Sequence, residues 1–335
     1  MNNHQRPWVI ARVLAMWAVT TLAAVGCGDR ADTRSNVDTG ADSQSDAEVK
    51  EAPTISEPEH SVPEGFLADA GAGWKTLVTG KWDLEAGTES YRCVRYTLPQ
   101  DVDIGSFRAL IPLGTHHTVL TVGEATSTPD GISGCSAATN AQRQIAGSGV
   151  GTNDYVLPKG VAVHLRAGQQ LLLNLHLFNV SDELLSGTSG TLIKTIEKRE
   201  IEHKAEVTLA GPVNLTIPSG GPTLQSGNCT FMQEGTIIAL LPHMHQLGIH
   251  LKATAHSSVD GDVVIHDAPY DFDEQVVYPL EKPVHMKLGD KLQVDCTYMN
   301  TTSKTVNFGD SSLAEMCFAG IMRYPETNGS FICAN

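Results

Sequence analysis

The sequence is poor in positive charge, in long apolar runs and in helical periodicity. Its 335 residues include 23 Lys and Arg against 38 Asp and Glu, for a net charge of −15. This balance excludes nucleic acid as an expected partner, because phosphates are bound mainly by Lys and Arg. No long stretch repeats its apolar residues every 3.6 positions, so no long amphipathic helix is expected. The 41% hydrophobic content and the mean hydropathy of −0.12 are typical of a globular chain, and the length predicts about two domains.

The N-terminus has the features of an export signal. Arg6 and Arg12 precede an apolar run over residues 13–26, which is shorter than the roughly 20 residues that span a bilayer but suits a signal peptide. The small residues before Cys27 resemble a bacterial lipobox, so residues 1–27 are interpreted as a signal peptide whose final cysteine is lipidated. An ordinary cleavage after Gly26, which leaves Cys27 as a free thiol, is the alternative. We expect an exported, membrane-anchored bacterial lipoprotein that faces the periplasm or the cell exterior, with the membrane as a partner through this lipid anchor.

The segment after Cys27 has the composition of a tether. Residues 28–62 contain nine acidic and three basic residues, a net charge of −6, and no aromatic residue. Such a segment cannot bury enough apolar surface to offset the entropy lost on ordering, so we expect it to be disordered. Subtracting the tether and the signal peptide leaves −11 on the remaining body, which is typical of an acidic, soluble surface.

The body, from residue 63, has the pattern of an all-β protein. Short apolar runs alternate with Gly and Pro turns, which favours tandem antiparallel β-sandwiches of jelly-roll-like type. Residues 161–165 and 171–178 flank a tight turn and predict a hairpin, as do residues 284–288 and 292–294. A break near residues 199–206 predicts two domains, over 63–205 and 206–335.

His243 and His245 are candidate metal ligands. They flank Met244 after an apolar run, and residues two apart on a strand share a face. Both imidazoles can therefore hold one ion while Met244 faces away. The spacing alone is also compatible with two ordinary polar-face histidines.

His116, His117 and His176 are less clear from spacing. Neighbouring strand residues point to opposite faces, so His116 and His117 can share a metal only where the strand bends or ends. His176 shares a face with Leu172, Asn174 and Phe178, where a histidine at the rim of a core is the simpler interpretation. The spacing of these three residues therefore leaves a metal site open without requiring one.

Four short motifs follow one another along the body: Gly114-Thr115-His116-His117, Leu173-Asn174-Leu175-His176, Pro242-His243-Met244-His245 and Glu315-Met316-Cys317. Their order and spacing resemble the copper type II, ascorbate-dependent monooxygenases, which include dopamine β-monooxygenase and the peptidylglycine α-hydroxylating enzyme. The resemblance covers residues from about 75 to the C-terminus. Residues 135–140 and the ending from Met316 to Cys333 resemble the dopamine-type branch in particular.

The resemblance implies two coppers per chain with different roles. His116, His117 and His176 match the site that stores and delivers an electron, and His243, His245 and Met316 match the site where O2 is activated. Ascorbate or another one-electron reductant is the implied electron source. The donor types suit this division, because imidazole holds both copper oxidation states whereas a thioether favours Cu(I). Without the resemblance, Met316 would be interpreted as a core residue.

The cysteine count is consistent with this interpretation. Seven cysteines are an odd number, and removing Cys27 leaves six. The resemblance implies the pairs Cys93–Cys135, Cys229–Cys333 and Cys296–Cys317, the last of which would hold the chain beside Met316.

The expected function is hydroxylation of a substrate C–H bond by a copper monooxygenase similar to dopamine β-monooxygenase. Peptide-amidating members have an Arg where this sequence has Leu241, and Asn and Tyr where it has Phe318 and Gly320. Leu241 and Phe318 therefore predict a more apolar pocket for a small-molecule substrate of unknown identity. A non-catalytic copper-binding exported lipoprotein on the same double sandwich is the alternative.

Overall fold

Strands make up nearly all of the regular structure in the computed structural model, which describes residues 65–272, 274, 276–309, 311, 313–327 and 332–334. These residues contain no α-helix and a single 3-10 turn, η1 (Lys198–Glu200), so the all-β prediction is confirmed. No helix in this part of the chain is long and apolar enough to cross a membrane. The predicted signal peptide, with Cys27, and the predicted tether lie outside the described residues.

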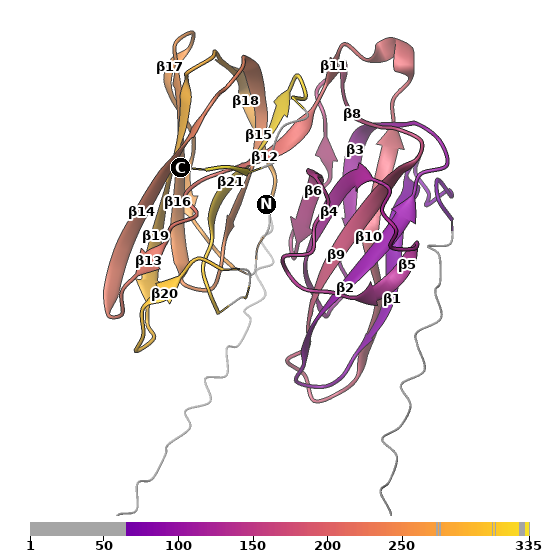
Figure 1. Ribbon diagram of the computed structural model, residues 1–335, viewed down its shortest axis with the longest axis horizontal. Coiled ribbons are helices and arrows are strands. Elements are labelled where there is room, and N and C mark those ends of the chain that lie inside the picture. Colours follow the sequence, from indigo (N-terminus) through magenta and orange to yellow (C-terminus); the bar gives the residue numbers. More distant parts are fainter. Residues whose placement is uncertain are drawn as a thin grey trace, which may run out of the picture. The chain divides into compact units, whose positions relative to one another are not determined.

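Two sheets form the N-terminal half (Figure 1). In spatial order the first contains β1 (Lys75–Leu84), β10 (Leu185–Thr195), β3 (Val102–Leu110), β8 (Val161–Leu165) and β11 (His203–Lys204), with β7 (Tyr155–Val156) paired to β3. The second contains β5 (Gly131–Gly134), β2 (Glu89–Thr97), β9 (Gln169–Phe178), β4 (Thr115–Glu124) and β6 (Arg143–Gly149). Alternate residues of both sheets, such as Ile104 and Leu173, are buried in one shared core, as expected for strands with one face inward.

The C-terminal half also has two larger sheets. One contains β18 (Tyr278–Met286), β15 (Gly235–Met244), β21 (Cys317–Tyr324), β12 (Glu206–Ala210) and β22 (Ile332–Cys333). The other contains β14 (Gly221–Thr230), β19 (Lys291–Asn300), β16 (Gly248–Ser257) and β17 (Gly261–Pro269), and a short pair joins β13 (Thr216–Ile217) to β20 (Val306–Asn307). In the described residues the named strands pair antiparallel, except for the short parallel pairs β8–β11 and β12–β22.

Neither of the two expected hairpins forms. Strand β8 pairs with β3 and β11, whereas β9 lies between β2 and β4 in the other sheet. In the same way β18 pairs with β15, whereas β19 pairs with β14 and β16. Both turns lead from one sheet into another. The hairpin predictions were wrong because a tight Gly turn is equally compatible with a corner between packed sheets.

Apolar packing continues from one half into the other. The core of the N-terminal half includes Val207, Ile238, Ala239 and Met322 from β12, β15 and β21, and β12 packs against β6. A salt bridge of 3.0 Å between Arg143 and Glu326 also joins the halves. The described residues accordingly belong to one compact unit.

The structure contains three disulfides, Cys93–Cys135, Cys229–Cys333 and Cys296–Cys317. They are the three pairs that the family resemblance implies. Stable disulfides are typical of proteins that fold in an oxidising compartment, which fits an exported chain.

Candidate metal centres

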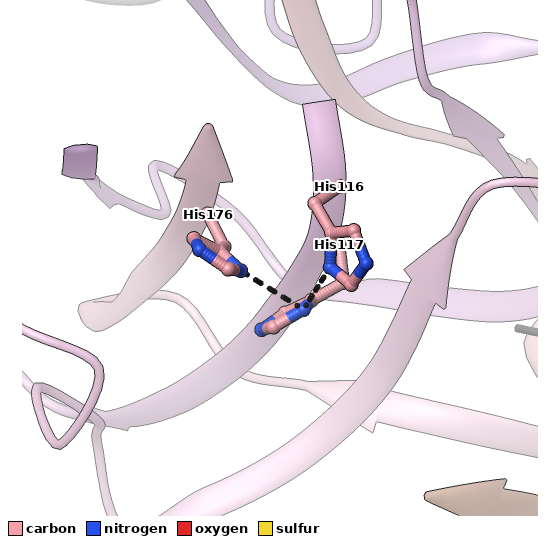
Figure 2. Close-up of side chains that lie close together, drawn as sticks. All are labelled: His116, His117 and His176. Atoms are coloured by element: carbon pink, nitrogen blue, oxygen red, sulfur yellow. Dashed lines mark hydrogen bonds between the residues drawn. The ribbon is translucent and has the colours of Figure 1, made fainter. Parts of the chain in front are cut away.

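A β-bulge brings the first histidine cluster together. Along β4 and β9, Thr115 pairs with Leu177 and His117 pairs with His176, so His116 is an extra residue in its strand. A bulge bends the strand and re-aims side chains, which meets the condition under which neighbouring histidines can share one ion. Figure 2 shows His116 and His117 on one strand and His176 on the next, with the dashed lines meeting at His117.

The three ring nitrogens lie at the spacing of a metal site. Nδ1 of His117 is 3.0 Å from Nδ1 of His116 and 3.3 Å from Nδ1 of His176, and the possible ligand atoms of the cluster all lie within 4.8 Å of one another. A single Nδ1 proton on His117 can satisfy only one of these two contacts. A cation held between the rings would satisfy all three lone pairs, so the arrangement fits a metal.

Burial keeps these imidazoles neutral. It is the main cause that lowers the pKa of His116 to about 4 and the pKa of His117 well below its usual value. It also lowers the pKa of His176, against the opposing effect of Glu89. Neutral imidazole is the form that binds a metal. In the described part of the chain, Nε2 of His116 is buried without a hydrogen-bond partner.

Two residues of β2 contact the His176 side chain. Glu89 lies 2.5 Å from Nε2 of His176, and the Tyr91 ring stacks on the imidazole at 4.5 Å between centroids. Because the carboxylate accepts the Nε2 proton, the Nδ1 lone pair faces His117. No local pattern in the sequence pointed to Glu89 or Tyr91, since the β2–β9 pairing that brings them to His176 is not visible in the spacing.

The second candidate centre lies where β15 ends. Met244 is buried in the core of the C-terminal half, which confirms that it faces away from the neighbouring histidines. The rings of His243 and His245 lie 5.3 Å apart between centroids, at 90°. The β15–β21 ladder pairs Met244 with Cys317, so Met316 follows in the position across from His245.

Backbone contacts orient His245. Its Nδ1 lies 3.0 Å from the carbonyl oxygen of Ala314, which can only accept a hydrogen bond, so the Nε2 lone pair is the one available to a metal. Glu315 accepts hydrogen bonds from the backbone N–H groups of His245, at 3.0 Å, and Leu247, at 2.7 Å. Burial raises the pKa of Glu315 to about 7, while these bonds oppose the rise.

The two candidate centres are neighbours. The rings of His117 and His243 lie 5.9 Å apart between centroids. Phe272 packs on His116 at 4.2 Å and lies 6.4 Å from His245. Phe272 belongs to the loop between β17 and β18, and nothing in the spacing of the sequence pointed to it.

An apolar cleft opens beside the second centre. It holds about 600 Å³ of empty space, part of it open to solvent, and is lined by both halves. On the face of β15 and β21 that carries His243, the ladder pairs Ala239 with Met322, Leu241 with Gly320 and His243 with Phe318. Leu241 and Gly320 line the cleft, about 7 Å along the strands from the histidine. Phe318, the other predicted pocket residue, is buried and packs edge-on against Phe308.

The cleft offers no evident anchor for a charged group. Among the described residues that line it, Arg108 is the charged one. Its guanidinium forms two hydrogen bonds with Asp154 and lies over the Trp74 ring. The cation is therefore already neutralised, and the remaining lining is apolar or uncharged.

Comparison with known proteins identifies the class. Residues 206–335 match the family described as copper type II ascorbate-dependent monooxygenase, C-terminal domain, and relatives from this family match the chain more widely. Together these matches support the copper type II ascorbate-dependent monooxygenase family for this chain, with residues 206–335 as its C-terminal domain. The donor sets described above, imidazole with and without a thioether, fit copper.

The particular relatives are distant. A human DBH-like monooxygenase protein 2 is 26% identical over 64% of this chain and 47% of its own length. The mouse DBH-like monooxygenase protein 2 is 28% identical over 64% of this chain and 38% of its own. Peptidyl-glycine alpha-amidating monooxygenase A of Xenopus laevis is 27% identical over 71% and 26%. The match thus spans less than half the length of each relative.

Similarities to solved structures are weak. They include a structure of infectious bursal disease virus, with 10% identity, coverage of 77% and 72% of the two chains and a TM-score of 0.18. Another is the dimeric latent PorU of Porphyromonas gingivalis, with 8% identity, coverage of 71% and 24% and a TM-score of 0.19. TM-scores this low support no conclusion about the fold or the function of this chain.

Proposed function

We propose that the chain is a copper monooxygenase that hydroxylates a C–H bond of a small, uncharged and largely apolar substrate. The reaction consumes O2, two electrons and two protons. One oxygen atom enters the new hydroxyl group and the other leaves as water. Ascorbate or a similar reductant gives the electrons one at a time. Copper at the two centres would supply the one-electron redox chemistry that activates O2.

The main support for the proposal is that two different sets of candidate copper ligands lie next to each other. His116, His117 and His176 offer three nitrogens, whereas His243, His245 and Met316 would offer two nitrogens and a soft thioether that favours Cu(I). The ring contact between His117 and His243 makes the two sets neighbours. Copper storage does not need two different sites side by side, whereas a two-electron reaction fed one electron at a time uses both.

The cleft supports the substrate class. An amine or a carboxylate in the cleft would meet no free counter-charge, because Arg108 is already held by Asp154, and burial of an unpaired charge is costly. Burial of apolar surface is favourable at about 25 cal/mol per Å². The cleft therefore selects a neutral, apolar substrate beside the centre that contains His243.

Oxygen uptake on copper-loaded protein tests the proposal. Ascorbate-dependent O2 consumption is measured with neutral apolar compounds, phenethylamines and peptides that end in a carboxylate, while product is quantified by mass spectrometry. We expect one hydroxylated product per O2 with a neutral compound and least turnover with the peptides. Protein that binds two coppers and never couples O2 uptake to product is instead a non-catalytic copper-binding protein. Preferred turnover of a peptide carboxylate contradicts the substrate class.

We also propose that the mature chain is attached to a membrane through lipid on Cys27, and that each half is a jelly-roll-like sandwich. The lipobox-like residues before Cys27 support the anchor, and the two sheets around a common core in the N-terminal half support the sandwich. Fractionation of cells that express Cys27→Ala tests the anchor: release of the variant from the membrane is expected, and equal retention contradicts the proposal.

A further inference from the structure

Glu315 is a buried carboxylate whose observed bonds go to the chain around the second metal centre. Its side chain is fully buried, and no ion-pair partner for it lies within the described residues. Oε2 accepts the N–H of His245 and Oε1 the N–H of Leu247. The backbone N–H of Met316, the next residue, helps to hold down the pKa of this carboxylate. A buried carboxylate is costly unless it is hydrogen-bonded, and here those bonds hold both elements that carry ligands.

Two buried tyrosines donate to backbone carbonyls beside the candidate ligands. The hydroxyl of Tyr270 donates to the carbonyl of Met244, and the hydroxyl of Tyr298 donates to the carbonyl of Met316, both at 2.7 Å. The peptide unit between Met244 and His245 is therefore bonded at its carbonyl by Tyr270 and at its N–H by Glu315. Two bonds to one peptide plane restrict its rotation, which fixes the direction in which His245 leaves the chain.

Met316 is held through its carbonyl and through its two neighbours in the chain. The Tyr298 hydroxyl donates to its carbonyl, the preceding residue, Glu315, is bonded to the end of β15, and the next residue, Cys317, is tied to Cys296 by a disulfide. The carbonyl of Ala314 also accepts the Nδ1 proton of His245. The segment 314–317 and the end of β15 are thus joined by side-chain and backbone bonds before any metal binds.

We propose that Glu315 is a positioning residue of the second centre, with Tyr270 and Tyr298 as its partners: its carboxylate holds His245 and Met316 at the separation that one copper ion requires. This inference rests on the assignment of a copper site to His243, His245 and Met316 under the proposed function. Preorganised support of this kind sets the precision of a metal site. Loss of such a support typically lowers metal affinity about 10- to 100-fold.

Glu315→Gln in the full chain tests the inference, because it keeps the shape but turns an amide N–H₂ toward one of the backbone donors. Copper affinity is measured against a competing chelator in a His117→Ala background, which isolates the second centre, and in a His243→Ala background, which isolates the first. We expect a loss of about 10- to 100-fold at the second centre and no change at the first. X-ray absorption of the reduced protein should show a weakened sulfur contribution from Met316.

A measurement on the metal-free protein separates an effect on the position of the ligand-bearing backbone from an effect on copper binding. In the apo protein, Glu315→Gln should accelerate amide hydrogen exchange of His245 and Leu247 about tenfold or more, since a bond to a charged acceptor is lost. Asp130→Asn is the matched control, because Asp130 also accepts a backbone N–H, that of Thr97, in the other half. It should leave copper binding at both centres unchanged.

The outcomes distinguish the inference from the proposed function. Wild-type protein that binds copper only at the three-histidine centre overturns the proposed function, and the inference with it. Wild-type protein with both coppers, but with unchanged affinity and amide exchange in Glu315→Gln, overturns the inference alone. If Glu315→Gln does not fold, Tyr298→Phe replaces it. That variant removes one bond to Met316 and should weaken the second centre several-fold, and unchanged affinity there likewise contradicts the inference.

Discussion

The two candidate metal centres are built in different ways. The first lies within one sheet, where the β4–β9 ladder places His117 opposite His176 and a bulge adds His116. The second lies where β15 ends, and combines a strand terminus with the segment before β21. Ladder register positions the first set of candidate ligands, whereas buried side chains bonded to the backbone support the second set. A site inside a sheet takes its rigidity from the ladder, and a site at a strand end needs added support.

The residues that support the two candidate centres, Glu89 and Glu315, also differ in what they contact. Glu89 contacts the ring of His176, so it acts on the electronic character of a ligand as well as its orientation. The hydrogen bonds that the described residues give to Glu315 come from the backbone N–H groups of His245 and Leu247, so it acts mainly on the position of the chain. The first candidate centre is thus influenced through a candidate ligand, whereas the second is held by its surroundings and lies near the apolar cleft.

Met316→Ile gives the sharpest test of the difference between the centres. The change removes the thioether and keeps an apolar side chain, so we expect turnover to fall to background while the three-histidine centre keeps its copper. Copper stoichiometry and O2 uptake are measured on the same preparation. Activity equal to that of the wild type would remove Met316 from the site.

Glu89→Gln tests the support of the first centre. Without the carboxylate, Nε2 of His176 loses a charged acceptor, so copper affinity at this centre should fall about 10- to 100-fold while the second centre is unaffected. The measurement is a chelator titration in the His243→Ala background. Glu124→Gln is the control, because Glu124 forms an exposed pair with Arg166 on the same half. Equal affinities of all three proteins would show that the contact has no part in metal binding.

Leu241→Arg tests whether the cleft belongs to the second centre. A guanidinium beside Gly320 puts a cation into an apolar lining, so kcat/KM for a neutral substrate should fall about tenfold, the size expected for loss of one to two kcal/mol of binding. Turnover of a carboxylate-bearing compound should rise in relative terms. An unchanged preference between the two substrates would separate the cleft from catalysis. Copper binding at both centres serves as the control.

Asn174→Ala should have the smallest effect on the metal centres. The buried amide of Asn174 donates to the carbonyls of Ser136 and Thr139, at 2.9 and 3.0 Å, and so ties the loop after Cys135 to β9. Its loss should lower the free energy of unfolding by about 1–3 kcal/mol, because the buried amide group and its part-buried hydrogen bonds to the loop are removed. Copper affinity should change little, since the amide does not touch His176. Denaturant titration measures the first effect, and a strong loss of copper would show that the loop itself supports the site.

Several features of the sites could be predicted from local sequence. Alternation along a strand placed His243 and His245 on one face and Met244 in the core. It also placed His176 on the face opposite Leu173 and its neighbours, which are buried in the core. The two hairpin predictions were wrong because they concern the pairing between strands, which local sequence does not determine. A tight turn determines that the chain reverses but not which strand it then pairs with, and that pairing is a long-range choice.

The remaining parts of the sites depend on contacts between distant segments. Glu89 meets His176 across a sequence separation of 87 residues, and Glu315 meets His245 across 70. No periodicity within either segment encodes such a meeting. A buried carboxylate in particular is recognised only once its hydrogen-bond partners are known.

The sequence by itself determined the all-β class, the donor types, and the face of each strand on which a donor lies, because these follow from residue chemistry and the two-residue repeat of a strand. Only the tertiary structure decided that His116 sits in a bulge, that His117 approaches His243, and that Glu315 holds the chain on both sides of the second centre. These outcomes depend on strand register and on packing between the two halves, which arise from the whole chain at once and leave no local pattern to read.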